Sequence, residues 1–255
     1  MDTRTQEFLN DPIFPLLVRM AAPNTIAFFI QAIVVLTEVW FISKLGTTSL
    51  AAVALAFPIL MITQQMAFGA LGGAVTSSIA RSIGAGDTIR AEKLLWHSLL
   101  IASCGAVVFL LAFLLGGESL LKILGGKGPL LEESLSYCMI FLTGGILIWL
   151  SGSLSAALRG MGNMRYPAML MSISSGMQVI LSGGFILGWF GFPKLGIAGA
   201  AVSALASGGF MSLMMFLKLS SSSSKINLKI SRFSFEKELF KDILDVFLPA
   251  SLAPV

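Results

Sequence analysis

Residues 20–42 read MAAPNTIAFFIQAIVVLTEVWFI, an apolar stretch broken by only a few polar side chains. A helix needs about 20 mostly apolar residues to cross the hydrocarbon core of a bilayer. This stretch is long enough, and its one ionisable residue is Glu38. The sequence therefore predicts a transmembrane helix that carries a single acidic group.

Working outward from this helix, the same criterion selects further stretches along the chain. Together they are six, at about 20–42, 51–80, 94–115, 135–158, 167–190 and 195–219. The breaks between them, such as SKLGTTS and GAGDTIRAEK, are rich in Gly and polar residues, which favour turns. We predict an all-α polytopic membrane protein in which residues 1–219 form a six-helix transmembrane bundle.

The composition excludes a soluble protein. The chain is 56% hydrophobic and 12% charged, whereas soluble domains carry roughly 25% charged residues. It lacks the polar residues to cover a water-facing surface, so the lipid bilayer is its predicted surrounding. The net charge of +4 does not indicate nucleic acid, because the basic residues lie between apolar stretches and form no basic face.

The distribution of Lys and Arg predicts the orientation in the membrane. With the N-terminus in the cytoplasm, only Lys44, Lys122, Lys127 and Lys194 of the 17 basic residues fall in outer loops. Cytoplasmic loops carry the excess of Lys and Arg, which favours this orientation in a plasma (inner) membrane. The first residues, MDTRTQEFLNDP, are polar and acidic, so we predict that the first apolar stretch is retained and is no signal peptide.

After the sixth stretch the sequence changes character. Five serines open a polar and basic segment, 220–241, which we interpret as a flexible cytoplasmic linker. Residues 242–255 then begin another apolar run in which Pro249 aligns with Pro23. Because six spans return the chain to its starting side, we interpret 242–255 as the truncated start of a second, parallel lobe. The expected partner is that second lobe or, alternatively, a second copy of the chain.

Glu38 is the residue most suggestive of function. A charged side chain inside a bilayer costs about 2.5–3.5 kcal/mol on insertion scales, and burial disfavours the charged form of a carboxyl group. Such a group can bind and release a proton or small cation. The alternative is a glutamate near the outer interface that reaches water. Asn24 and Gln31 precede it at intervals of seven, on the same helical face. They are predicted to line a cavity or, alternatively, to tie helices together.

Other polar residues carry weaker signals. Gln64 lies near the middle of the second stretch and is a cavity candidate, although the small residues after it favour close helix packing. Cys104 and Cys138 show no ligand spacing, so neither a disulfide nor a metal role is predicted. His97 is expected at an interface. Since no second catalytic group accompanies Glu38, we predict no enzymatic activity and no cofactor.

Several segments together resemble the multidrug and toxic compound extrusion (MATE) family. They are MAAPNTIAFFIQAIVVLTEVWFISKLG, LAAVALAFPI, GAGD, ALRGMGNMRYP and GFPKLGIAGAAVSA, in the family's order across essentially the whole chain. The resemblance implies one six-helix lobe of a twelve-helix exporter, which exchanges small organic compounds, often cationic, for protons or sodium.

The resemblance also implies site residues. Glu38 falls where the family usually has an aspartate implicated in cation coupling. Where the family often has N-x-x-x-D in the fifth helix, this chain has Gln178 and Ser182. The second acid is therefore missing, and Glu38 is expected to act with neutral partners such as Gln178, Gln31 and Ser182.

Two alternatives remain open at this point. A flippase for lipid-linked precursors belongs to the same superfamily, but the absence of a mid-membrane Lys or Arg disfavours it. A non-transporting membrane subunit would need no acid inside a span. A proton- or sodium-coupled exporter is the interpretation that accounts for Glu38.

Overall fold

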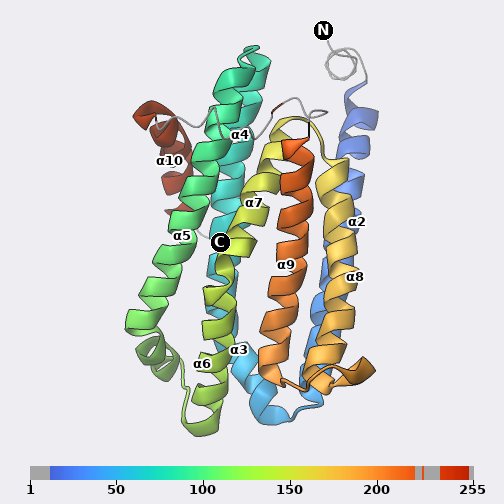
Figure 1. Ribbon diagram of the computed structural model, residues 1–255, viewed down its shortest axis with the longest axis vertical. Coiled ribbons are helices and arrows are strands. Elements are labelled where there is room, and N and C mark those ends of the chain that lie inside the picture. Colours follow the sequence, from blue (N-terminus) through green and yellow to red (C-terminus); the bar gives the residue numbers. More distant parts are fainter. Residues whose placement is uncertain (1–11, 222–225, 227–235, 253–255) are drawn as a thin grey trace.

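The computed structural model describes residues 12–221, 226 and 236–252, and in this part of the chain the regular elements are helices with no strand (Figure 1). In order they are α2 (Ile13–Ser43), α3 (Thr47–Gln64), the π-helical turn η1 (Gln65–Ala70), α4 (Leu71–Gly84), α5 (Thr88–Ile123), α6 (Gly128–Thr143), α7 (Gly145–Gly160), α8 (Arg165–Leu187), the 3-10 turn η2 (Trp189–Gly191), α9 (Ile197–Ser220) and α10 (Lys237–Leu252).

Five helical stretches of the described chain are long and apolar enough to cross a membrane, and a bent pair makes up to six. One of the five, Thr47–Gly84, runs through α3, η1 and α4 without a break. The bent pair is α6 and α7, which meet at 47°. At Gly144, where they join, an added Cβ atom would lie 2.4 Å from Leu205 Cδ1 of α9, so a larger residue would require the Leu205 side chain to move. The predicted all-α membrane bundle is confirmed.

The helices extend past the predicted apolar stretches. The first begins at Ile13 where about 20 was expected, and the third covers Thr88–Ile123 where 94–115 was expected. Hydropathy marks only the lipid-facing part of a helix, whereas capping decides where it begins. Asp87 caps α5 by accepting a hydrogen bond from the backbone N–H of Arg90 at 2.8 Å.

The expected linker, 220–241, is partly helical, which corrects its upper boundary. Helix α10 starts at Lys237, because its apolar residues recur with helical spacing between charged ones and give it one apolar face. Most of the remaining linker lies outside the described residues, as do residues 1–11, on which the signal-peptide prediction depends.

The bundle has two ends, which we name after one residue each. At the Asp87 end α2 begins and the connections α4–α5 and α7–α8 lie; at the Lys44 end lie the connections α2–α3, α5–α6 and α8–α9 (Figure 1). One buried apolar cluster joins α4, α5, α7, α9 and α10 toward the Asp87 end. A second joins α2, α3, α6, α8 and α9 toward the Lys44 end.

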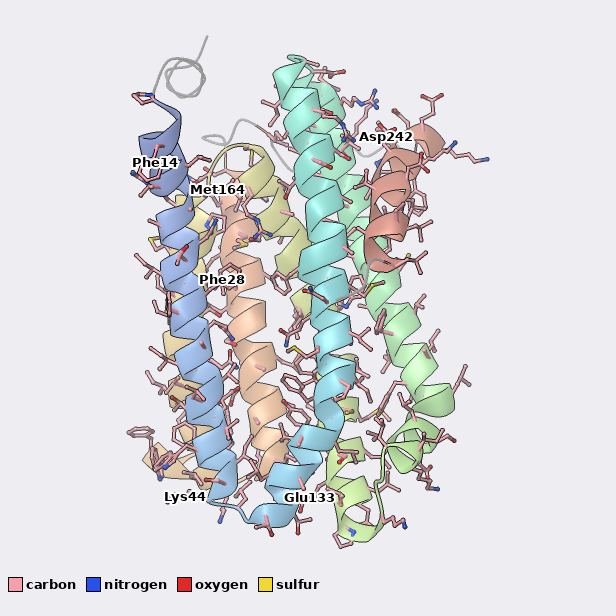
Figure 2. All side chains as sticks on the ribbon, turned by 180° about the vertical axis from the view of Figure 1, so that it is seen from behind. Phe14, Phe28, Lys44, Glu133, Met164 and Asp242 are labelled. Atoms are coloured by element: carbon pink, nitrogen blue, oxygen red, sulfur yellow. The ribbon has the colours of Figure 1, made fainter. Side chains whose placement is uncertain are left out.

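The outer surface of the bundle is also apolar (Figure 2). Phe28 is 64% exposed and Leu115 is 89% exposed. Helices that are hydrophobic on all sides are typical of membrane spans, since lipid replaces water around them.

Candidate functional site

Glu38 of α2 is bound to α8 by two hydrogen bonds. Its Oε1 atom accepts from Gln178 Nε2 at 2.9 Å and from Ser182 Oγ at 2.8 Å. Gln178 and Ser182 are four residues apart in one helix and therefore share a face. The acid is thus held by neutral donors that come from a single neighbouring helix.

The network continues from Gln178 to α9. Ser207 Oγ donates to Gln178 Oε1 at 3.2 Å, so the amide accepts from one helix while it donates to another. Ser182 and Ser207 are both buried. Both donors reach the same carboxyl oxygen, Oε1, which can accept them whether or not Oε2 carries a proton. A chain of polar groups therefore connects α2, α8 and α9 inside an apolar bundle.

Tyr137 of α6 was not singled out from the sequence. It is 7% exposed, and it lies close enough to Glu38 to interact electrostatically with it. No spacing in the sequence links α6 to α2, so the proximity arises only from tertiary packing. The described residues place no second acid and no cation in an ion pair with Glu38.

The other two polar residues on this face of α2 also point to α8 or its start. Gln31 Oε1 accepts a hydrogen bond from Ser175 Oγ at 2.9 Å. Asn24 Nδ2 lies 4.0 Å from the sulfur of Met164, next to the first turn of α8 (Figure 2). Gln31 therefore does not join the Glu38 cluster, and all three residues connect the same two helices.

Gln64 lies apart from this network. It ends α3 immediately before the π-helical turn η1, and among the described residues its side chain forms no hydrogen bond. Single π-helical turns inside long helices are frequent at functional sites. Sequence analysis did not predict this turn, because its composition differs little from that of the helix around it.

Aromatic rings cover the Glu38 cluster on the side of the Lys44 end. Trp189 of η2 packs edge-on against Phe41 at 5.4 Å between ring centroids and against Trp40 at 6.5 Å. Lys44 lies over the Trp40 ring at 5.1 Å. Tryptophan and lysine at a helix end are typical of the membrane–water interface, so Glu38 lies just inside this boundary.

His97 contradicts its expected interfacial position. It is fully buried, with Nδ1 at 2.7 Å from the carbonyl oxygen of Lys93 and Nε2 accepting from the backbone N–H of Glu236 at 3.0 Å. The docking of α10 buries it. Cys104 is exposed and Cys138 buried, both as free thiols.

Several classes of membrane protein have a bundle of apolar helices with a polar cluster in its interior, and comparisons with known proteins show to which family this chain belongs. The MatE family pattern matches residues 23–183, more than half of the chain. The chain therefore belongs to the MATE family.

Relatives and solved structures agree with this assignment. An FAD transporter of Shewanella oneidensis is 34% identical over 78% of this chain and 44% of its own length. A probable multidrug resistance protein NorM of Thermotoga maritima is 27% identical over 75% of this chain and 41% of its own. An outward-facing MATE transporter structure has a TM-score of 0.84 and 32% identity over 92% of this chain and 51% of its own. The chain thus spans about half the length of the relatives it matches.

Proposed function

We propose that this chain is one lobe of a secondary active exporter, which moves small organic compounds out of the cell in exchange for protons or sodium. The observation that carries the proposal is the Glu38 cluster, in which an acid inside a span is held by Gln178 and Ser182 with no basic partner. An ion pair would fix its charge, whereas neutral partners leave the carboxyl group able to change its state.

The geometry suggests how a bound proton could be sensed. Protonated Glu38 becomes a donor, and the Gln178 amide can turn over so that its carbonyl oxygen accepts from the acid. That turn reverses the bond to α9: Gln178 Nε2 then donates to Ser207 Oγ, whose own proton goes to the carbonyl oxygen of Ala204 at 3.0 Å. Sodium would instead recruit the oxygens of Glu38, Gln178 and Ser182, since hard cations prefer oxygen ligands. In either case, occupation of Glu38 alters how α2, α8 and α9 are joined.

The relatives support export but differ in cargo, since one is named for FAD and others for multiple drugs. A lipid-precursor flippase is less well supported, because within the described spans basic groups lie near the helix ends, as Arg159 does in the last turn of α7. A subunit without transport would leave the isolated acid unexplained. We infer that a second lobe completes the transport path and that the Asp87 end faces the cytoplasm. A thiol tag at the exposed Lys127, in the connection between α5 and α6, should then react from outside, and one near Asp87 only from inside.

Replacing Glu38 tests the proposal in a form of the protein that has both lobes. Glu38→Gln keeps the shape and hydrogen-bonding capacity but cannot exchange a proton. Export driven by a pH or sodium gradient should fall to the level of the empty vector, while Glu38→Asp should retain part of the activity. The matched control is Glu118→Gln, because Glu118 is exposed and paired with Lys122.

Expression and thermal stability should be the same for all three variants. Wild-type export by Glu38→Gln across the pH range would show that Glu38 is only an interfacial glutamate.

A further inference from the structure

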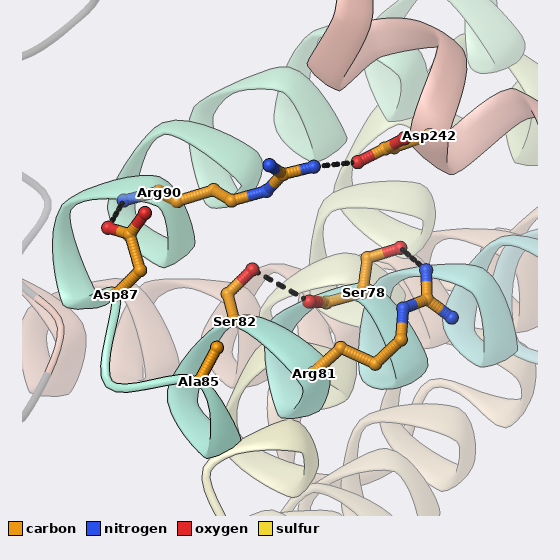
Figure 3. Close-up of a pocket in the computed structure, with 7 residues that line it drawn as sticks. All are labelled: Ser78, Arg81, Ser82, Ala85, Asp87, Arg90 and Asp242. Atoms are coloured by element: carbon orange, nitrogen blue, oxygen red, sulfur yellow. Dashed lines mark hydrogen bonds and ion pairs between the residues drawn. The ribbon is translucent and has the colours of Figure 1, made fainter.

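Helix α10 lies against α4 and α5 at the Asp87 end of the bundle, far along the chain from both (Figure 1). Figure 3 shows the polar side of this contact, a pocket of about 280 Å³ that Asp242 of α10 closes opposite Ser78 and Arg81 of α4. Asp242 forms an ion pair with Arg90 of α5 across its rim. The surface of α4 and α5 that receives α10 is here named the α4–α5 docking surface.

The first turn of α10 is held twice by α5. Lys93 Nζ forms an ion pair with the Glu236 side chain, and His97 Nε2 accepts from the Glu236 backbone N–H at 3.0 Å. Glu236 also accepts from the N–H of Phe240, so it is the residue from which the helix starts. Side chain and backbone of the same residue are therefore fixed by neighbouring residues of α5.

The apolar side of α10 is part of the core of the bundle. Leu239 is 4% exposed and Ile243 is fully buried, in one cluster with residues of α4, α5, α7 and α9. Leu244, Val246 and Phe247 are partly buried against the same cluster, and burial ends after them, since Leu248 is 53% exposed and Leu252 84% exposed. Residues 237–247 of α10 are thus packed on the bundle, whereas its last residues are not.

The sequence of α10 resembles the start of the first span, which is why we interpret it as the start of a second repeat. The run ILDVFLPASLA, in which Pro249 lies inside α10, aligns with LLVRMAAPNTIA around Pro23 of α2. By this alignment α10 corresponds to the first turns of α2 and would open the second lobe. A proline inside a helix removes one backbone hydrogen bond and crowds the carbonyl group four residues earlier, so Pro249 is a weak point.

We propose that residues 237–247 of α10 are a fixed part of the first lobe, held on the α4–α5 docking surface throughout transport. The second lobe then moves relative to the first by bending around Pro249, in a helix whose two ends belong to different lobes. This inference rests on the proposed two-lobe exporter. It assigns the docking surface to a segment of the same chain and places the boundary between moving bodies inside α10.

Cross-linking tests whether the contact holds or opens. The background carries Cys104→Ser and Cys138→Ala, and the test pair is Arg90→Cys with Asp242→Cys, joined by a short bifunctional thiol reagent with a reducible linker. In the 255-residue chain and in the two-lobe form, most molecules should cross-link. Export by the cross-linked two-lobe protein should equal export after reduction. The control pair, Arg90→Cys with Lys241→Cys, uses an exposed neighbour and should cross-link several-fold less.

Three outcomes overturn the proposal: a low yield for the test pair, a yield that changes with pH or sodium, or export that stops on cross-linking and returns on reduction. The last would make the contact a gate that opens. If the reduced two-lobe protein exports nothing, the proposed function fails, but the yield measured at different pH and sodium concentrations still decides whether α10 stays docked.

Discussion

The acidic residues of the Glu38 cluster and of the α10 contact differ in their bonding partners. Glu38 lies between helices and meets only neutral donors, from Gln178 and Ser182. Asp242 and Glu236 each meet a basic residue at a contact where the paired side chains are 28–46% exposed. The first arrangement leaves a charge without a counter-charge in an apolar region, and the second neutralises charges that water already screens.

This comparison indicates that ion pairs contribute little to the stability of the α10 contact. Exposed pairs contribute about 0–1 kcal/mol, whereas burying a leucine or isoleucine side chain contributes about 1.5–3 kcal/mol. Leu239 and Ile243 therefore hold α10 in place, and the ion pairs set its register. At Glu38, by contrast, the polar contacts are made to the acid itself, the group that the proposed transport would use.

Removing both donors to Glu38 is expected to have the largest effect. Without Gln178 and Ser182 the carboxylate loses two hydrogen bonds, each worth about 1.5–3 kcal/mol when one partner is charged. Gln178→Leu combined with Ser182→Ala should therefore reduce export nearly to the level of Glu38→Gln. The measurement is initial export rate in the two-lobe form, with Ser172→Ala as the control, since Ser172 bonds only within its own helix.

A double-mutant cycle sharpens this test. In the Glu38→Gln background the same two substitutions should lower the export rate little further, because the carboxylate that Gln178 and Ser182 bind is already absent. Equal losses in both backgrounds would mean that Gln178 and Ser182 act on packing alone.

A second acid beside Glu38 should have an intermediate effect. Ser182 lies 2.8 Å from Glu38, so Ser182→Asp puts two carboxyl groups in one site. Two carboxyl groups at this separation do not readily ionise together, because their negative charges repel, so one of them keeps its proton to higher pH. The pH at which export is half-maximal should therefore rise, with the maximal rate reduced only a few-fold. Ser182→Asn, which adds similar bulk without charge, should leave the pH profile in place; a shift in that variant too would point to packing.

The sequence predicted the fold better than the site. Apolar stretches identify spans because lipid imposes one requirement on every segment, and the helical bundle was confirmed. Glu38 stood out because an acid inside a span is costly. Gln178 and Ser182 entered only through the family resemblance, and the structure places both against Glu38; their role in coupling stays a prediction.

The remaining differences have physical reasons. Tyr137 of α6 interacts electrostatically with Glu38 of α2, and the periodicity within one helix cannot reveal which residues of another helix lie near it. Gln31 shares a helical face with Glu38 but lies two turns away, where Ser175 is its nearer partner. The start of α10 was placed in a linker because its charged residues lower the average hydropathy, although Leu239 and Ile243 have helical spacing.

The smallest effect is expected from the ion pair between Arg90 and Asp242. Arg90→Ala, Asp242→Ala and the double variant should each change the free energy of unfolding of the 255-residue chain by less than about 1 kcal/mol, as for other exposed pairs. For a chain of this size that corresponds to a shift of roughly 2–4 °C or less in Tm. Ile243→Ala is the matched comparison, since removing a buried isoleucine typically costs about 2–5 kcal/mol. Thermal unfolding in one detergent, followed by circular dichroism, measures all four variants. A coupling energy between Arg90 and Asp242 larger than the cost of Ile243→Ala would reverse the comparison, and charge pairing would then be what fastens α10 to the first lobe.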